Sequence, residues 1–254
     1  MAHSSKALAW AVLTITPLAA QMILQPPGKT VPQAKTREEL DAFGVVIDPA
    51  PPRAILEAAA RFRRMFPKSE FYEYACVAQM QAAMDLSDTR LAEETAATVL
   101  SLNSNNPEAL LTLAELDLVR FVASTGMDST RAALASERAK AALDKLRSLS
   151  LPALSDSHAW LRTKRSMLAR AHLVLAEVAI RQKMWETAEH ELQSVIDLAP
   201  SPKAYLLLSQ VYKHTNREDE ALAAAKKAHL SVSPGFASKS GDEYRVSQER
   251  EASQ

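Results

Sequence analysis

Side chains that could carry out chemistry are few in this sequence, and their spacing matches no catalytic or metal-binding motif. The chain has 6 histidines and 1 cysteine. His190 is followed by Glu191, but the second histidine of the helical H-E-x-x-H zinc motif is missing. A glycine-rich phosphate loop and a G-x-S-x-G nucleophile turn are missing as well. We therefore expect no catalysis, no metal and no cofactor. An enzyme with a dispersed site, gathering groups such as His172 and Glu177, is the alternative.

Two of these side chains have a structural interpretation. Cys76 is the only cysteine, so an intramolecular disulfide and a cysteine-based zinc site are excluded. Its helical surroundings, EYACVAQM, predict a buried thiol. His172 stands in an apolar helical segment, and we interpret it as a partly buried packing residue rather than a ligand.

The elements that must position any site are predicted to be helical. Glycine is scarce, with 5 residues, which favours helices over a sheet with tight hairpins. Thr36 with Glu39 is typical of a capping box, and Pro107 suits the first position of a helix. Apolar spacing predicts a short helix from near Arg37 and further helices at 53–66, 69–84, 88–102, 107–124, 129–149 and 156–183.

One helix-turn-helix pattern occurs twice in succession near the C-terminus. The first copy, residues 169–200, reads ARAHLVLAEVAIRQKMWETAEHELQSVIDLAP. The second, residues 201–234, reads SPKAYLLLSQVYKHTNREDEALAAAKKAHLSVSP. A period of about 34 residues is typical of a helical solenoid.

Both copies resemble the tetratricopeptide repeat (TPR) in where small and large residues stand. The matching positions are Leu175, Ala176, Trp185, Ala188 and Pro200, then Tyr205, Leu208, Ser209, Tyr212, Ala221, Ala225, Ala228 and Pro234. Ala179 departs from the pattern, because an aromatic is usual there, and Pro234 arrives one residue late. The resemblance implies an all-α, right-handed α-solenoid of antiparallel helix pairs over residues 36–235. The match over 69–118 is weaker, and an insertion around Pro152 breaks the period.

The resemblance also implies a concave groove lined by the first helix of each pair, able to bind a protein or peptide. The residues predicted to face it are Leu111, Glu115, Arg170, Leu173, Glu177, Lys203, Leu206, Gln210 and His214. The lysine and asparagine clamp that chaperone-binding TPR proteins use for a C-terminal carboxylate is not reproduced. The alternative is that leucines such as Leu206 pack against the C-terminal segment or a second subunit.

Charge is balanced over the chain and uneven along it. Equal numbers of acidic and basic residues, 30 each, argue against a nucleic-acid partner. Acidic residues dominate between Asp85 and Asp117, whereas basic residues dominate between Arg131 and Arg170. These sections could select a charged partner or support self-association, or they could be solvated helix faces.

The N-terminus is typical of an export signal. Residues 1–20 combine a weakly basic start, an apolar run and small residues before a predicted cleavage site after Ala20. A proline-rich linker, residues 21–35, follows, and residues 236–254 are predicted to be a disordered tail. This order is similar to that of secreted bacterial TPR-like scaffold proteins. We therefore expect a periplasmic or secreted protein; the alternative is an assembly factor anchored in the inner membrane by an uncleaved segment.

Overall fold

The chain folds as a stack of helix pairs, with no strand in the part of the chain that the structure describes. That part of the computed structural model comprises residues 32–48, 50–124, 128–149 and 157–232. The predicted signal (1–20), most of the linker (21–35), the insertion around Pro152 and the tail (236–254) lie outside it. The helices are α2 (Arg37–Ile47), α3 (Pro52–Met65), α4 (Tyr72–Asp85), α5 (Thr89–Leu102), α6 (Pro107–Ala123), α7 (Ser129–Ser148), α8 (Ser157–Arg181), α9 (Trp185–Leu198), α10 (Pro202–His214) and α11 (Glu218–Val232).

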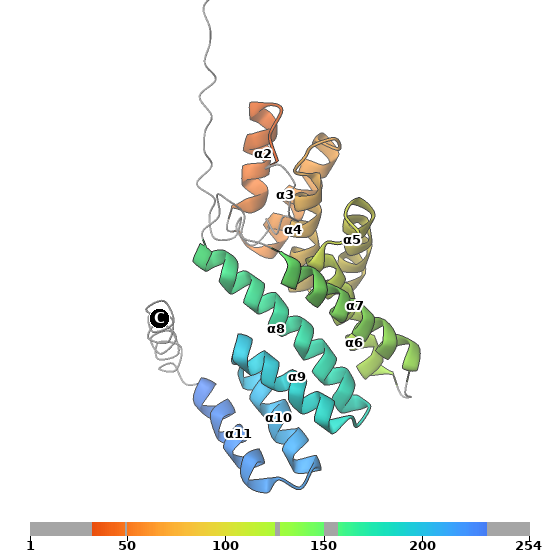
Figure 1. Ribbon diagram of the computed structural model, residues 1–254. Helices are drawn as coiled ribbons and strands as arrows, with labels where there is room; N and C mark the ends of the chain where they lie inside the picture. The colour runs from red at the N-terminus through yellow and green to blue at the C-terminus, as the bar shows by residue number, and fades with distance from the viewer. Residues whose placement is uncertain (1–31, 49, 125–127, 150–156, 233–254) are drawn as a thin grey trace, which may run out of the picture.

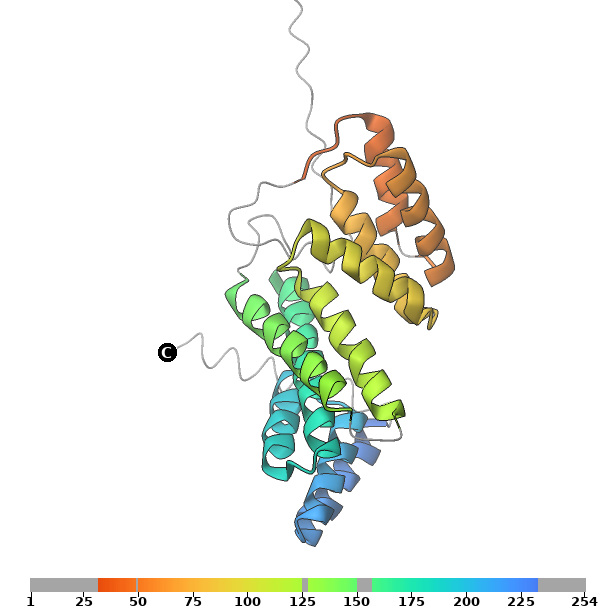
Figure 2. The same cartoon turned by 90° about the vertical axis from the view of Figure 1, so that its right-hand side faces the viewer.

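The helix pairs follow one another along one axis, from α2 at one end to α11 at the other (Figures 1 and 2). The closest packing is between α6 and α7, α8 and α9, and α10 and α11, while α3 packs against both α2 and α4. The predicted all-α solenoid is therefore confirmed. Within the described residues, no helix is long and apolar enough to cross a membrane.

Local chemistry explains where the helices begin. The Thr36 hydroxyl accepts from the backbone N–H of Glu39 at 3.1 Å, and the Glu39 carboxylate accepts from the N–H of Lys35 at 2.6 Å. Asn106 caps α6 by accepting from the N–H of Ala109, and Pro107 occupies the first helical position. Both starts agree with the sequence-based expectation.

The turns inside three helix pairs have the same geometry. Ser87, Lys183 and Asn216 have φ values of 59°, 59° and 58°, in the left-handed region that favours glycine. In each turn the N–H of the following residue donates to the carbonyl five residues back; the three bonds are Asp88 to Ala83, Met184 to Ala179 and Arg217 to Tyr212. This shared turn shows that α4–α5, α8–α9 and α10–α11 are equivalent repeat units.

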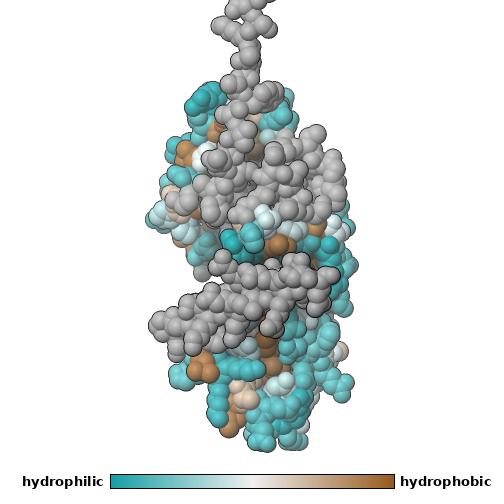
Figure 3. Space-filling model, turned by 60° about the vertical axis from the view of Figure 1, so that its left-hand side comes forward, coloured by the Kyte–Doolittle hydropathy of each residue, from teal (hydrophilic) through white to brown (hydrophobic). Residues whose placement is uncertain are grey.

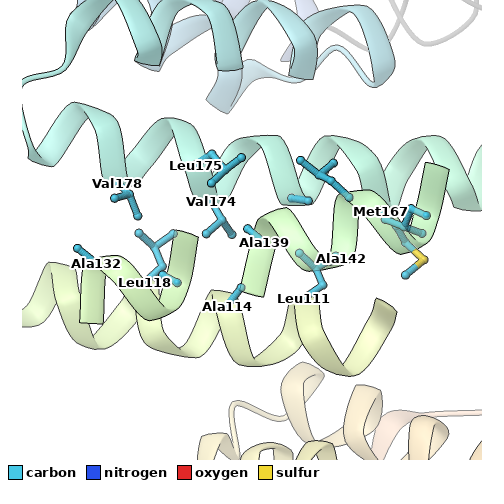
Figure 4. Packing of buried hydrophobic residues seen from close by; sticks show 14 of the residues in the cluster. Leu111, Ala114, Leu118, Ala132, Ala139, Ala142, Met167, Val174, Leu175 and Val178 are labelled. Atoms are coloured by element: carbon cyan, nitrogen blue, oxygen red, sulfur yellow. The ribbon is translucent and has the colours of Figure 1, made fainter. Parts of the chain in front are cut away.

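The core runs along the solenoid as a series of clusters, each shared by a helix pair and the first helix of the next pair. One cluster joins α2, α3 and α4, and another joins α4, α5 and α6. Cys76 is buried in the second of these, as predicted. The largest cluster joins α6, α7 and α8 (Figure 4), where the alanines of α7 allow the helices to approach closely. Two smaller clusters join α8, α9 and α10.

Candidate functional site

The first helix of each pair contacts the first helix of the neighbouring pairs, as a groove lined by these helices requires. Helix α6 lies between α4 and α8 and contacts both. Helix α8 reaches α10 through an ion pair between Glu177 and Lys203. We call α4, α6, α8 and α10 the inner helices, and we call the surface that they share the inner surface.

Charged residues on the inner surface bind one another across adjacent repeats. Arg170 of α8 donates from Nε and Nη2 to the Glu115 carboxylate of α6, at 2.9 and 2.8 Å, and from Nη1 to Glu108 at 2.8 Å. One repeat further on, Lys203 Nζ lies 2.6 Å from Glu177 Oε1. We call these two acid–base contacts rungs. These acids and bases pair with one another and therefore link neighbouring repeats. Four of the residues predicted to contact a partner are among them: Glu115, Arg170, Glu177 and Lys203.

The environment of Arg170 keeps its guanidinium charged. Burial acts to lower its pKa, but the attraction of Glu108 and the hydrogen bonds with Glu115 outweigh burial and raise the pKa above its ordinary value. The Glu108 side chain is only 9% exposed. This rung is therefore a largely desolvated ion pair, in which each charge depends on the others.

A pocket opens on the inner surface where α4, α6 and the first turns of α8 meet. Its volume is about 280 Å³, and it is lined by Gln81, Glu108, Ala159, Arg162, Thr163, Ser166, Met167 and Arg170. The Thr163 hydroxyl donates to the Ala159 carbonyl, and Arg170 is held by its rung. Among the described residues, Arg162 has no hydrogen-bonding or ion-pair partner, so its guanidinium is available to an anionic group.

Arg162 and Ser166 were missed by sequence reasoning. On this helix the predicted groove residues began at Arg170, because the first turns of α8 precede the regular repeat. A signal was present: Arg162, Ser166 and Arg170 follow one another at four-residue spacing, which places them along one helix face. Gln81 was missed because α4 matches the repeat pattern too weakly to be placed in register.

The prediction that Leu111 faces the groove is wrong. Its side chain is fully buried in the cluster of α6, α7 and α8, where Figure 4 shows it next to Ala142. The physical reason is the length of α8, which extends N-terminally past the regular repeat and covers this part of α6. Leu173 is partly buried and packs in the clusters shared with α10.

The remaining predicted residues are accessible. Leu206 is 57% exposed, and Gln210 and His214 are exposed on the same helix. The His214 ring stacks on Trp185, with centroids 4.4 Å apart and an interplanar angle of 10°. Helix α6 also exposes Val119 and Val122 near its C-terminal end. In the face drawn in Figure 3, the described apolar residues form small patches among polar ones.

The groups named for a dispersed catalytic site do not converge. His172 Nδ1 lies 2.6 Å from Glu191 Oε2, and both side chains are largely buried. Glu177 is engaged with Lys203. Among the described residues, no cluster of histidine, cysteine and carboxylate side chains could hold a metal ion. The interpretation of His172 as a packing residue agrees with this position.

The acidic and basic sections of the sequence meet inside the fold. Asp117 is paired with Arg138 and lies 3.9 Å from Arg131. Arg170 links to Glu108 and Glu115 in the same way, from the basic section to the acidic one. Much of the charge that could have selected a partner or driven head-to-tail stacking is therefore neutralised within the chain.

The paired helices, the recurring left-handed turn and the inter-repeat contacts define a TPR-like helical-repeat fold. No protein-family model matches the sequence, and no curated protein matches it. Among solved structures, MamA (residues 41 to the end) from Desulfovibrio magneticus RS-1 is similar, with a TM-score of 0.49 at 16% identity over 80% of this chain and 99% of that one. TTC0263, a thermophilic TPR protein of Thermus thermophilus, has a TM-score of 0.47 at 18% identity, covering 80% of this chain and 91% of that one.

Proposed function

We propose that this protein is a non-catalytic scaffold that binds a protein or peptide partner on its inner surface. The pocket around Arg162 is the observation that carries the proposal. It combines a guanidinium that lacks a partner within the described residues with the exposed Ser166 hydroxyl, in a hollow flanked by three inner helices. A guanidinium binds a carboxylate through two parallel hydrogen bonds, so an acidic side chain or a C-terminal carboxylate is the group that this pocket suits.

Apolar side chains elsewhere on the inner helices provide the rest of the proposed contact. Val119 and Val122 are 59% and 46% exposed on α6, and Leu206 is exposed on α10. Because Arg170 pairs with Glu108 and Glu115, and Lys203 pairs with Glu177, the charged groups between these apolar residues already have partners. An apolar part of a partner can therefore lie across the inner helices without separating a charge from its partner. A partner with an acidic group and apolar neighbours fits this distribution.

The proposal is tested by capturing partners with the mature protein and with variants of the pocket. Arg162→Glu reverses the charge in the pocket, and Ser166→Trp fills it; both positions are exposed, so the fold should persist. Arg61→Glu, an exposed arginine of α3 away from the pocket, is the matched control. We expect a partner retained by the native protein and by Arg61→Glu to be lost by both pocket variants.

Retention of that partner by both pocket variants would refute the proposed site. Circular dichroism of each variant separates loss of binding from loss of fold. Turnover of a small-molecule substrate that depends on the same residues would instead favour the enzyme hypothesis.

We also propose that the scaffold acts in the cell envelope, as the sequence of residues 1–20 indicates. Intact mass measurement of the protein from its native host would test this. A mature chain beginning at Gln21 would support export with cleavage after Ala20. A chain that retains Met1 and sediments with membranes would favour the anchored assembly factor instead.

A further inference from the structure

The C-terminal end of the described solenoid exposes leucines on its last helix pair. Leu206 of α10 and Leu222 and Leu230 of α11 are 57%, 56% and 58% exposed. We call the surface that carries them the end face. Leu222 and Leu230 belong to an outer helix, so the end face extends beyond the inner surface proposed to bind a partner.

One repeat earlier, the counterparts of Leu206 and Leu222 are covered by the helices that follow in sequence, whereas Asp197, the counterpart of Leu230, is exposed. Leu173 stands where Leu206 stands one repeat later, and it is partly buried against a cluster that includes Ala204 of α10. Glu189, the counterpart of Leu222, binds Arg217 of the next pair at 2.7 Å. The end face is thus built like a surface that the solenoid covers elsewhere.

The rungs stop at this end of the solenoid. In α8 the acid of a rung, Glu177, follows Arg170 by two helical turns, whereas Gln210 occupies the equivalent place after Lys203. Phe236 stands 33 residues after Lys203, which itself stands 33 residues after Arg170. At the next interval, Gln210 stands in place of the acid and Phe236 in place of the base, so a further ion pair of this kind cannot form. The aromatic side chain of Phe236 suits contact with an apolar surface.

The same spacing continues at two buried positions. Ala171 and Ala204 are fully buried and 33 residues apart, and Ala237 follows at the same interval. Val178 and Val211 are buried with the same spacing, and Tyr244 comes next. Residues 233–254 thus carry apolar side chains at places where the preceding inner helices dock.

We propose that the chain's own C-terminal segment, residues 233–254, covers the end face, with Phe236 and Tyr244 as its anchoring side chains. The segment starts directly after α11, and its attachment gives it a high effective concentration at this face. A second copy or another protein must associate from solution and lacks that advantage. Leu206 also belongs to the proposed partner contact, so the test of this inference uses Leu222 and Leu230, which lie on the outer helix α11.

Thiol labelling of the full chain tests the proposal. Cys76 is fully buried, and burial raises the pKa of its thiol to about 11, so the native cysteine gives little background. The reporters are Leu222→Cys and, separately, Leu230→Cys. The matched control is Leu102→Cys, a leucine that is 50% exposed on α5.

Each reporter is measured with the natural C-terminal segment and with Phe236→Ser combined with Tyr244→Ser. We expect the natural segment to slow labelling of both end-face thiols by about tenfold, and the double substitution to abolish this protection. Labelling of the Leu102→Cys control should be the same in both backgrounds, and circular dichroism should show equal helix content.

Two results would overturn the proposal. In the first, end-face thiols react equally fast in both backgrounds. In the second, protection disappears on dilution while sedimentation shows a dimer dissociating, which identifies a second copy as the occupant.

Discussion

The rung centred on Arg170 makes a quantitative prediction about what holds neighbouring repeats together. Arg170→Met removes the guanidinium but keeps an unbranched apolar stem of similar shape. It leaves Glu108, whose side chain is 9% exposed, and Glu115, at 23%, without their cation. Removing one partner of a buried ion pair costs about 3–5 kcal/mol. The Arg170 side chain is 35% exposed, so water screens part of this effect and we expect about 2–3 kcal/mol.

The assay is urea and thermal unfolding followed by circular dichroism. For a domain of this size, the expected loss corresponds to a fall in Tm of about 4–12 °C. Arg37→Met is the control, because Arg37 and Asp41 form a pair whose side chains are 85% and 61% exposed. Its cost should be below about 0.5 kcal/mol. Adding Glu108→Gln to Arg170→Met removes the stranded charge and should recover part of the loss.

The pH dependence provides a second check on the same residue. The pKa of Arg170 is raised, so its contribution is fully present below the ordinary arginine pKa and is lost only at still higher pH. The difference between native protein and Arg170→Met should therefore stay constant between about pH 6 and 9. A cost no larger than that of Arg37→Met would refute the view that the rung stabilises the packing of α6 against α8.

Three further outcomes are expected. Leu111→Ala should destabilise the protein by about 3 kcal/mol, because it leaves a cavity at a fully buried site, whereas Leu102→Ala, at a half-exposed leucine of α5, should leave the thermal unfolding curve nearly unchanged. A hydrogen bond from Arg120, together with its positive charge, lowers the pKa of Glu93, and this stabilisation is present above the ordinary carboxylate pKa and is lost as pH falls through the lowered one. The stability gap between native protein and Arg120→Gln should therefore close in acid unfolding measurements. Burial raises the pKa of Cys76 to about 11, so its alkylation at pH 8 should be slow in native protein and fast in urea.

The helices could be predicted because their determinants are local. Thr36, Asn106 and Pro107 satisfy or avoid the free backbone groups of a helix start within one turn of chain. The observed bounds of α5 and α7 accordingly differ from the predicted ones by a single residue at one end. The left-handed turns could not be predicted from sequence in the same way. Glycine usually marks this backbone conformation, but Ser87 and Lys183 occupy the position here.

The candidate site could be predicted only in part, because burial and pairing depend on helices distant in sequence. Arg170 meets Glu115 across 55 residues and Glu108 across 62, beyond the reach of any local pattern. Leu111 and Leu206 occupy matched places in their inner helices, yet one is core and the other is exposed. The difference arises because α8 covers α6, whereas no described helix follows α11.

The shared register of the rungs has a consequence for how this chain could be lengthened or shortened. Glu115 and Glu177 provide the acid at equivalent places, and Arg170 and Lys203 provide the base. A chain lacking α8 and α9 would therefore place Glu115 opposite Lys203, and a duplicated α8–α9 unit would place Glu177 opposite a second Arg170. In both rearrangements an acid of one unit meets a base of the next, so neighbouring units can pair in more than one combination. In the shortened chain Glu108 and Glu115 would share the single charge of Lys203, so the fold could gain a unit at this junction more readily than it could lose one.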